Sequence, residues 1–157
     1  MKVTNKDGKK VREATVTEDS ILGFFGKYRF LSNFHMHEIT MKDGFTYPSA
    51  ENAYQAYKLK NQEKREPFTR YTCGEAQRMG QRVELREDWE KVKVDVMSQC
   101  LEEKFKDPEL FHMLKETEPK HLEESNDWGD RFWGTVNNVG SNMLGKLLMQ
   151  IRDRAES

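Results

Sequence analysis

Residues 47–58 of this 157-residue chain read YPSAENAYQAYK, and this stretch predicts an extended entry followed by an amphipathic helix. Its proline disfavours helix in the residue before it, and Ser49 is of the type that caps the first free backbone N–H groups. Glu51 falls in the first turn, where the positive end of the helix dipole favours a carboxylate. Helical spacing places Glu51, Gln55 and Lys58 on one stripe, which is either an ordinary solvated surface or the lining of a pocket.

The composition excludes several classes of partner. The chain carries 26 basic and 27 acidic residues, a formal net charge of −1, so only a local patch or a single altered nucleotide would contact nucleic acid. Cys73 and Cys100 lack the spacing of a metal or redox site, which predicts two buried thiols in a reducing compartment. The longest apolar runs, such as Met143–Met149, are too short to cross a bilayer. We therefore expect a cytoplasmic protein without a membrane partner.

The first half of the chain predicts short strands. Asp7-Gly8 is a turn signal within the polar residues 1–20, which form a loose hairpin or a partly ordered leader. Residues 21–25 are apolar and predict a buried strand. Asp43-Gly44 lies between residues 35–41 and 45–47 and predicts a hairpin that leads into the Ser49 helix.

The second half predicts mainly helices. They are expected over residues 63–70, where Pro67 interrupts or starts the helix; over 75–82; from Asp88, with Trp89, Val92, Val96, Cys100 and Phe105 on one face; over 109–115 after Pro108; and after Ser141, with Met143, Leu144, Leu147, Leu148 and Ile151 as the core stripe. Residues 121–124 predict a short strand. The fold class is therefore α+β, a predominantly helical single domain over residues 21–157 with a small β-hairpin or sheet near the N-terminal half.

The loop over residues 126–142 departs from this pattern. It combines Asp127 and Asp130 with Trp128 and Trp133 among glycines and asparagines. Long loops in compact domains often carry function, and tryptophans beside carboxylates suit stacking on a flat ring together with acid/base chemistry. The alternative is that the two tryptophans fold back as a lid over the core. For Trp89, periodicity alone favours a packing role over a role in a pocket.

Five blocks of sequence, taken in order, resemble the NADAR family of YbiA-like proteins. They are FLSNF at 30–34, YPSAENAYQAYK at 47–58, EAQRMG at 75–80, DWEKVK at 88–93 with the helix that follows, and NDWGDRFWG at 126–134 with GSNMLGKLLM at 140–149. The resemblance covers roughly residues 22–153. It implies a YbiA-like fold and hydrolysis of N-glycosidic bonds to ribose in nucleotide-like substrates.

The resemblance also assigns residues to the site. The glutamate of the family's P-S/T-x-E segment is Glu51, the aspartate and tryptophan of its D-x-x-W-G segment are Asp130 and Trp133, and Trp89 belongs to its D/N-W-E segment. Many members have histidine directly after the glutamate, where this chain has Asn52. If that histidine tunes the glutamate, the pH behaviour of this chain differs.

On this basis Glu51 would orient or deprotonate the attacking water and stabilise the cationic sugar, with Asp130 as the second carboxylate. The expected substrate-binding residues are Asn33, Phe34, Lys58, Trp89, Trp128, Trp133, Ser141 and Asn142. Lys58 would reach a phosphate, and Ser141 and Asn142 would add backbone N–H donors at the start of the last helix. No metal and no redox cofactor is implied.

Two substrate classes fit the resemblance: early riboflavin-pathway ribosylaminopyrimidine phosphates, and ADP-ribosylated guanine, free or in nucleic acid. The alternative function is a non-catalytic module that binds an NAD- or ADP-ribose-like ligand, which would not need an ionised Glu51. A purely structural partner protein fits the polar aromatic loop less well. The sequence does not indicate an oligomeric state.

Overall fold

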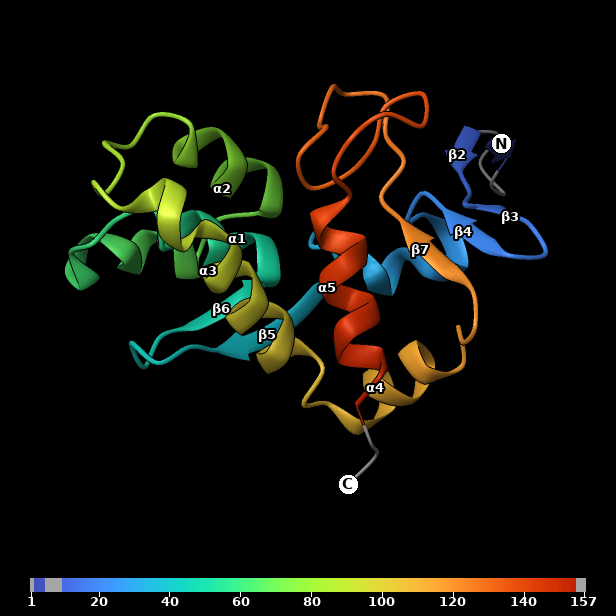
Figure 1. Ribbon diagram of the computed structural model, residues 1–157. Coiled ribbons are helices and arrows are strands. Elements are labelled where there is room, and N and C mark those ends of the chain that lie inside the picture. The colour runs from blue at the N-terminus through green and yellow to red at the C-terminus, as the bar shows by residue number, and fades with distance from the viewer. Residues whose placement is uncertain (1, 5–9, 155–157) are drawn as a thin grey trace. The chain divides into compact units, whose positions relative to one another are not determined.

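The computed structural model describes residues 2–4 and 10–154 (Figure 1). In chain order the elements are β1 (Lys2–Thr4), β2 (Lys10–Arg12), β3 (Thr15–Val16), β4 (Ser20–Leu22), the 3₁₀ helix η1 (Gly26–Leu31), β5 (Met36–Thr40), β6 (Thr46–Ser49), α1 (Ala50–Ala56), the 3₁₀ helix η2 (Gln62–Thr69), α2 (Cys73–Gly80), α3 (Trp89–Lys104), α4 (Pro108–Lys115), β7 (His121–Glu123) and α5 (Met143–Arg152).

The chain divides into two compact units. Unit 1 combines residues Met1–Ser32 with Pro108–Ser157, and unit 2 comprises Asn33–Asp107. The single domain predicted over residues 21–157 stays a prediction. The α+β class is confirmed, with most of the regular structure in helices and a small hairpin in the N-terminal half.

Unit 1 is built around a three-stranded sheet in the order β3-β4-β7. β4 runs parallel to β7 and pairs Ile21 with Leu122, and both side chains are fully buried. α5 packs against β7 and places Leu144 and Leu148 in the same core. The strand predicted over residues 121–124 is thus confirmed as β7.

The N-terminal hairpin is confirmed by the antiparallel pairing of β1 with β2, whereas its predicted Asp7-Gly8 turn lies outside the described residues. The buried strand predicted over 21–25 begins one residue earlier and ends at Leu22. It ends there because Gly23 has φ +84°, a left-handed conformation that interrupts strand pairing.

Unit 2 begins with the predicted hairpin of β5 and β6. Ile39 pairs with Tyr47, and an irregularity in register lies between Met36 and Ile39. The turn is closed by Asp43, whose carboxylate accepts hydrogen bonds from Phe45 N at 2.9 Å and from the Tyr47 hydroxyl at 2.7 Å. β6 leads directly into α1, and Ser49 caps that helix as predicted, accepting from Asn52 N at 3.1 Å.

A buried ion pair joins this hairpin to η2. Arg65 Nη1 lies 3.4 Å from Asp43 Oδ2, and the Arg65 guanidinium lies 4.0 Å from the centre of the Tyr57 ring. Burial, followed by the charge of Asp43, raises the pKa of Tyr57 to about 12. The end of α1 is therefore fixed against both the hairpin and η2.

The predicted helices of unit 2 form with three differences. The helix expected over residues 75–82 lies two residues earlier, as α2 at Cys73–Gly80, because Thr72 caps it. The segment expected over residues 63–70 is a 3₁₀ helix with Pro67 inside it. α3 begins after Asp88 as predicted, but Asp88 makes no capping hydrogen bond because its carboxylate is held by Arg86 at 2.6 and 3.1 Å. Trp89, Val96 and Cys100 are buried as predicted, whereas Val92 is half-buried.

In unit 1, α5 begins one residue later than predicted. Asn142, not Ser141, is its N-cap and has the left-handed φ of 49°. Its predicted core stripe is buried except for Met143, which is half-buried.

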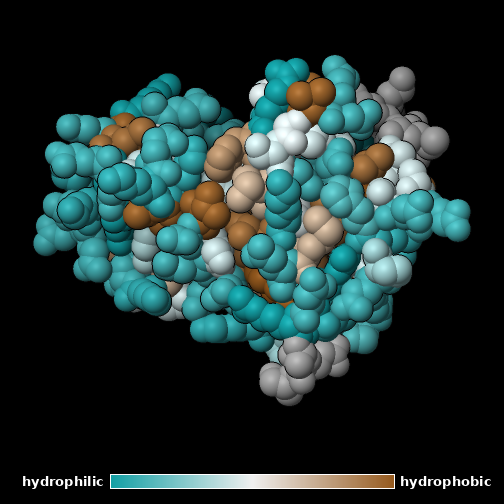
Figure 2. Space-filling view, in the orientation of Figure 1, coloured by the Kyte–Doolittle hydropathy of each residue, from teal (hydrophilic) through white to brown (hydrophobic). Residues whose placement is uncertain are grey.

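The cysteines, the lengths of the helices and the polarity of the surface agree with what the composition indicates. Cys73 and Cys100 are buried and are not joined in a disulfide, as predicted. Among residues 2–4 and 10–154, no helix is long and apolar enough to cross a membrane. Hydrophilic residues predominate on the face drawn in Figure 2, in keeping with a sequence that is 34% charged.

Candidate functional site

Glu51 is a buried acid in the first turn of α1. Its side chain is only 7% exposed although it carries a carboxylate, so the stripe predicted as solvated surface or pocket lining is not solvated surface. Gln55, one turn later, donates from Nε2 to Glu51 Oε1 at 3.3 Å. The backbone N–H of Glu51 donates to Asn33 O at 3.1 Å, which joins the segment before β5 to the start of α1.

Two buried acceptors near Glu51 have no hydrogen-bond partner among the described residues. They are Oδ1 of Asn33 and Oε1 of Gln55. The amide nitrogens of both side chains are bonded: Asn33 Nδ2 donates to Met97 Sδ at 3.3 Å, and Gln55 Nε2 donates to Glu51. Because a buried acceptor without a partner is costly, such atoms mark a place where water or a ligand bonds. These acceptors and the Glu51 carboxylate belong to residues that are in direct contact.

Lys58 lies seven residues after Glu51, just beyond the end of α1 at Ala56. Burial lowers the pKa of Lys58, and the negative charge of Glu51 opposes this effect. Its Nζ donates to Gly80 O at 3.3 Å, so the ammonium is anchored at the end of α2. The charge of Glu51 also affects Cys100 of α3. Burial is the larger cause that raises the pKa of the Cys100 thiol, and the Glu51 carboxylate is the next.

Asn52 stands where many family members have histidine, and in this chain it anchors α1. It is fully buried and donates from Nδ2 to Phe68 O at 2.9 Å and to Tyr71 O at 2.8 Å. Adjacent helical residues do not face each other, so position 52 is badly placed to act directly on Glu51. The expectation that this substitution changes the pH behaviour stays a prediction.

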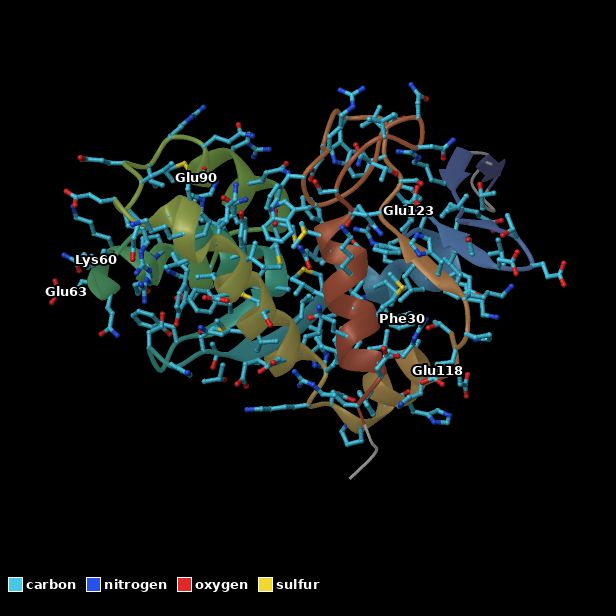
Figure 3. All side chains as sticks on the ribbon, viewed as in Figure 1. Phe30, Lys60, Glu63, Glu90, Glu118 and Glu123 are labelled. Carbon is cyan, nitrogen blue, oxygen red and sulfur yellow. The ribbon has the colours of Figure 1, made fainter. Side chains whose placement is uncertain are left out.

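The aromatic candidates of unit 2 have different surroundings. Trp89 is 5% exposed and packs against Tyr54, with ring centres 5.2 Å apart. Phe34 is half-buried, and its carbonyl accepts from the Cys73 thiol at 3.5 Å. A separate cavity of about 710 Å³ lies between η2 and the segment 83–88, with the exposed Lys60 (Figure 3) in its lining. None of the predicted site residues lines this cavity.

In unit 1 the second predicted carboxylate, Asp130, is held by its own loop. Its Oδ1 accepts from Phe132 N at 3.0 Å and from Trp133 N at 2.9 Å. The side-chain amide of Asn126 makes two hydrogen bonds to the backbone of Asp130. It accepts from Asp130 N at 3.0 Å and donates to Asp130 O at 2.9 Å. Oδ2 of Asp130 has no hydrogen bond within the described part of the chain, so one carboxylate oxygen is structural and the other is available.

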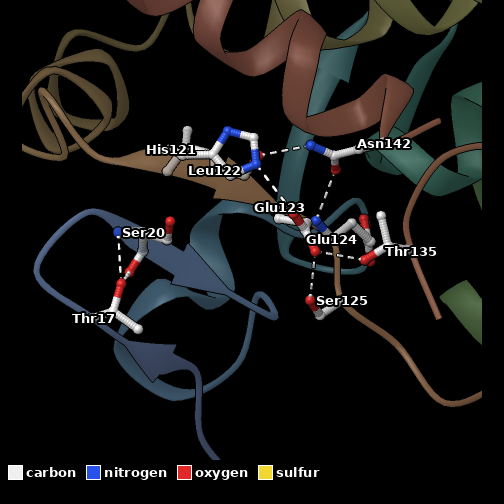
Figure 4. Close-up of polar contacts among 9 residues, drawn as sticks. All are labelled: Thr17, Ser20, His121, Leu122, Glu123, Glu124, Ser125, Thr135 and Asn142. Carbon is white, nitrogen blue, oxygen red and sulfur yellow. Dashed lines mark hydrogen bonds and ion pairs between the residues drawn. The ribbon is translucent and has the colours of Figure 1, made fainter. Parts of the chain in front are cut away.

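Asn142 fixes the far end of this loop. Its amide donates to Leu122 O at 2.9 Å and accepts from Glu124 N at 3.0 Å, which joins the start of α5 to β7 (Figure 4). The backbone N–H groups of Ser141 and Asn142 donate to Arg131 O and Gly134 O. They are therefore occupied, and the reason for expecting them to bind a phosphate does not hold in this structure.

The two loop tryptophans differ in exposure. Trp128 is 54% exposed and meets the Phe25 ring edge-on, with ring centres 6.2 Å apart. Trp133 is half-buried and stands perpendicular to Phe132 at 4.8 Å. Trp128 thus does not act as a lid over the core, and an exposed ring of this kind is suited to stacking.

The structure groups Asn33, Phe34, Glu51, Lys58 and Trp89 in unit 2, and Trp128, Asp130, Trp133, Ser141 and Asn142 in unit 1. Sequence reasoning did not select Gln55 and Asn126 as site residues. Gln55 was detectable from its i,i+4 spacing to Glu51. Asn126 was detectable from its spacing to Asp130, because asparagine side chains bond nearby backbone groups in turns.

Comparison with known proteins shows the family of the chain. The NADAR domain family matches residues 22–156. N-glycosidase YbiA of Shigella flexneri is 37% identical over 147 residues, which cover 88% of this chain and 91% of that protein. The chloroplastic riboflavin biosynthesis protein PYRR of Zea mays is 33% identical over 89% of this chain and 26% of its own length.

The fold is also similar to a solved structure. The NMR structure of the Escherichia coli protein YbiA matches with a TM-score of 0.75 and 35% identity, covering 88% of this chain and 86% of that one. The sequence blocks, the buried acid of α1 and the shared fold lead to one conclusion: the chain belongs to the NADAR domain family, the family of the YbiA N-glycosidases.

Proposed function

We propose that the chain is an N-glycosidase that hydrolyses the bond between ribose and the nitrogen of a base or amine. The observation that carries this proposal is the burial of Glu51 beside two buried acceptors without partners, Asn33 Oδ1 and Gln55 Oε1. Names of relatives support it, since they include N-glycosidase YbiA. A non-catalytic binding module would have no need to keep a carboxylate in a buried first turn.

In the proposed reaction the bond from ribose C1 to nitrogen breaks and water adds its oxygen to C1. Glu51 takes the proton from that water and stabilises the positive charge that develops on the sugar. The departing nitrogen keeps the bonding electron pair and gains a proton. Gln55 holds the Glu51 carboxylate in one orientation, and the amide oxygen of Asn33 accepts a hydrogen bond from water or a sugar hydroxyl.

Asp130 is the second carboxylate of the proposal. Because its Oδ1 is bonded to two backbone N–H groups, Oδ2 is the atom that binds ribose hydroxyls or passes a proton to the leaving group. Trp128 stacks on the base, and Lys58 balances a phosphate of the substrate.

The proposed substrate class is a phosphorylated ribosylaminopyrimidine of early riboflavin synthesis. Support comes from the name of a relative, a riboflavin biosynthesis protein whose sequence aligns with most of this chain. ADP-ribosylated guanine shares the same bond type, and the near-zero net charge of the chain does not favour broad contact with nucleic acid.

The test is a product assay by mass spectrometry with three substrates side by side. They are the ribosylaminopyrimidine phosphate, free ADP-ribosyl guanosine and an ADP-ribosylated guanine oligonucleotide. Release of the aminopyrimidine is the expected result. Release of guanine product alone would keep the N-glycosidase and replace its substrate, and ligand binding without any cleavage would establish the binding module instead.

A further inference from the structure

Arg12 connects the N-terminal hairpin to the loop that carries Asp130. It is the last residue of β2 and precedes the family domain, which begins at residue 22. Its Nη1 lies 3.2 Å from Asp127 Oδ1, and its guanidinium carbon lies 4.3 Å from the centre of the Phe25 ring and 5.8 Å from that of Trp128. These four side chains form the Arg12 cluster, which lies entirely within unit 1.

The backbone beneath the cluster allows this close approach. Gly26 has φ +57°, and a Cβ built there would lie 3.5 Å from Glu13 Cγ and 3.8 Å from Arg12 O. The chain that follows β2 therefore runs directly over the turn after Phe25. Phe25 in turn meets Trp128 edge-on at an angle of 88°. The hairpin and the loop thus share Phe25 as a common support.

The loop segment between Asn126 and Asp130 needs such a support. Asn126 fixes both ends of the segment through its bonds to Asp130 N and O, but Gly129 has φ +90° and no atom within 4 Å of the place of a Cβ. Trp128 itself is more than half exposed. Within the described residues, Arg12 supplies the hydrogen bond to the Asp127 side chain and a cation over the Trp128 ring.

We propose that Arg12 is a positioning residue, which holds Trp128 ready to stack on the flat base of the substrate. This inference rests on the proposed function, because it assigns the loop of Asp130 to substrate binding. Arg12 acts through Asp127 and Trp128 and not on the reacting atoms. Its loss therefore weakens binding equally in the ground state and the transition state, which raises KM and leaves kcat unchanged.

The kinetic test compares Arg12→Ala and Arg12→Lys with Lys27→Ala as the matched control. Lys27 is an exposed cation of the same unit that lies over Tyr28 and not over the loop. Arg12→Ala should raise KM by roughly three- to tenfold, the size of a lost exposed ion pair plus a cation–π contact. Arg12→Lys should show a smaller increase in KM, because lysine keeps the charge but not the planar guanidinium. The KM of Lys27→Ala should equal that of the parent.

A second readout does not depend on turnover. Quenching of tryptophan fluorescence by acrylamide is measured with and without Arg12→Ala, and Trp128→Phe in each background isolates the Trp128 signal. Arg12→Ala should increase the quenching of Trp128. An unchanged KM in an active Arg12→Ala enzyme, a fall in kcat alone, or unchanged quenching would overturn the assignment of Arg12. An inactive parent would instead count against the N-glycosidase, and the quenching result would still decide the role of Arg12.

Discussion

The two proposed carboxylates are secured in different ways. Glu51 is buried in α1 and held by Gln55, whereas Asp130 is half-buried and uses one oxygen to organise its own loop. A single substitution of Asp130 therefore mixes two effects, the loss of a loop anchor and the loss of a charge. Asparagine keeps an oxygen at the Oδ1 position and alanine does not, so the two effects are separable.

We expect Asp130→Asn to keep the stability of the parent within about 0.5 kcal/mol, as for a substitution that breaks no native contact. Asp130→Ala leaves two backbone N–H groups without an acceptor and should cost about 1 to 2 kcal/mol. Both variants should lose activity, by roughly a hundredfold or more. Urea unfolding together with initial rates measures this, and an active Asp130→Asn enzyme would remove Asp130 from the chemistry.

At the scale of elements, α1 and α2 are in contact at Gly80. A Cβ built on Gly80 would lie 1.9 Å from Gln55 Oε1 and 2.7 Å from Gln55 Cδ. Gln55 is buried and bonded to Glu51, so it has to leave that position if residue 80 acquires a side chain. The last residue of α2 therefore controls the surroundings of the proposed base.

Gly80→Ala should destabilise the protein by about 1 to 3 kcal/mol through overpacking, and should lower activity because Gln55 is displaced from Glu51. Gly74→Ala is the matched control in the same helix, since a Cβ there meets only Arg78 Nη1 at 3.5 Å. That control should be neutral or stabilising by about 0.4 to 1 kcal/mol. Thermal unfolding of both variants checks the contrast, and equal stability of the two would contradict the packing described for α2.

Glu123 of β7 is a carboxylate that stabilises the fold through hydrogen bonds. Burial by itself would raise the pKa of Glu123, but hydrogen bonds from Thr135, His121 and Ser125 outweigh it and lower the pKa (Figure 4). Thr135 Oγ1 donates at 2.7 Å and joins the loop of Asp130 to the strand. The ionised form of Glu123 thus stabilises unit 1.

A lowered pKa in the folded state gives a stability contribution that is present above the ordinary value of 4.5 and is lost as pH falls through the folded value. Glu123→Gln should therefore unfold more easily than the parent at pH 7, and this difference should shrink as pH falls below 4.5. The exposed Glu84→Gln serves as the control for removal of one carboxylate. Chemical unfolding at several pH values gives the two curves, and a difference that does not change with pH would contradict this role.

Local sequence signals predicted the β5–β6 hairpin and α1, but they did not predict which residues pack around these elements. Asp43-Gly44 and Ser49 act on their own neighbours, so the hairpin and the capped α1 are confirmed. The burial of Glu51 was not predictable, because it results from packing between helices distant in sequence. The same holds for the start of α5, where Asn142 bonds β7 and replaces Ser141 as the cap. The start of α2 was predicted two residues too late, at residue 75, because the Thr72-x-x-Glu75 capping-box pattern was not used.

At the scale of the whole molecule, the proposed chemistry draws on both compact units. Glu51 belongs to unit 2 and Asp130 to unit 1, so a joint role in one reaction requires evidence from kinetics. Residues that act as a unit on one transition state are strongly non-additive. The rate of a variant with both Glu51 and Asp130 substituted therefore shows whether the two residues act on the same transition state.

We expect the double variant Glu51→Gln/Asp130→Asn to be no more than about threefold slower than Glu51→Gln alone, because the second carboxylate has little left to assist once the first is lost. Multiplied losses in kcat/KM would show that the two residues act independently. The rates are measured at substrate concentrations far below KM for the parent, both single variants and the double variant.

Glu51 is the catalytic base of the proposed reaction. The most direct test of this role is the rate of aminopyrimidine release from the ribosylaminopyrimidine phosphate by Glu51→Gln, with Glu75→Gln as the control. Glu75 is likewise a first-turn glutamate, but it is exposed and belongs to a capping box. We predict a fall of roughly a hundredfold or more for Glu51→Gln and parental rates for Glu75→Gln. A folded Glu51→Gln enzyme that keeps more than about a tenth of the parental rate would contradict the account.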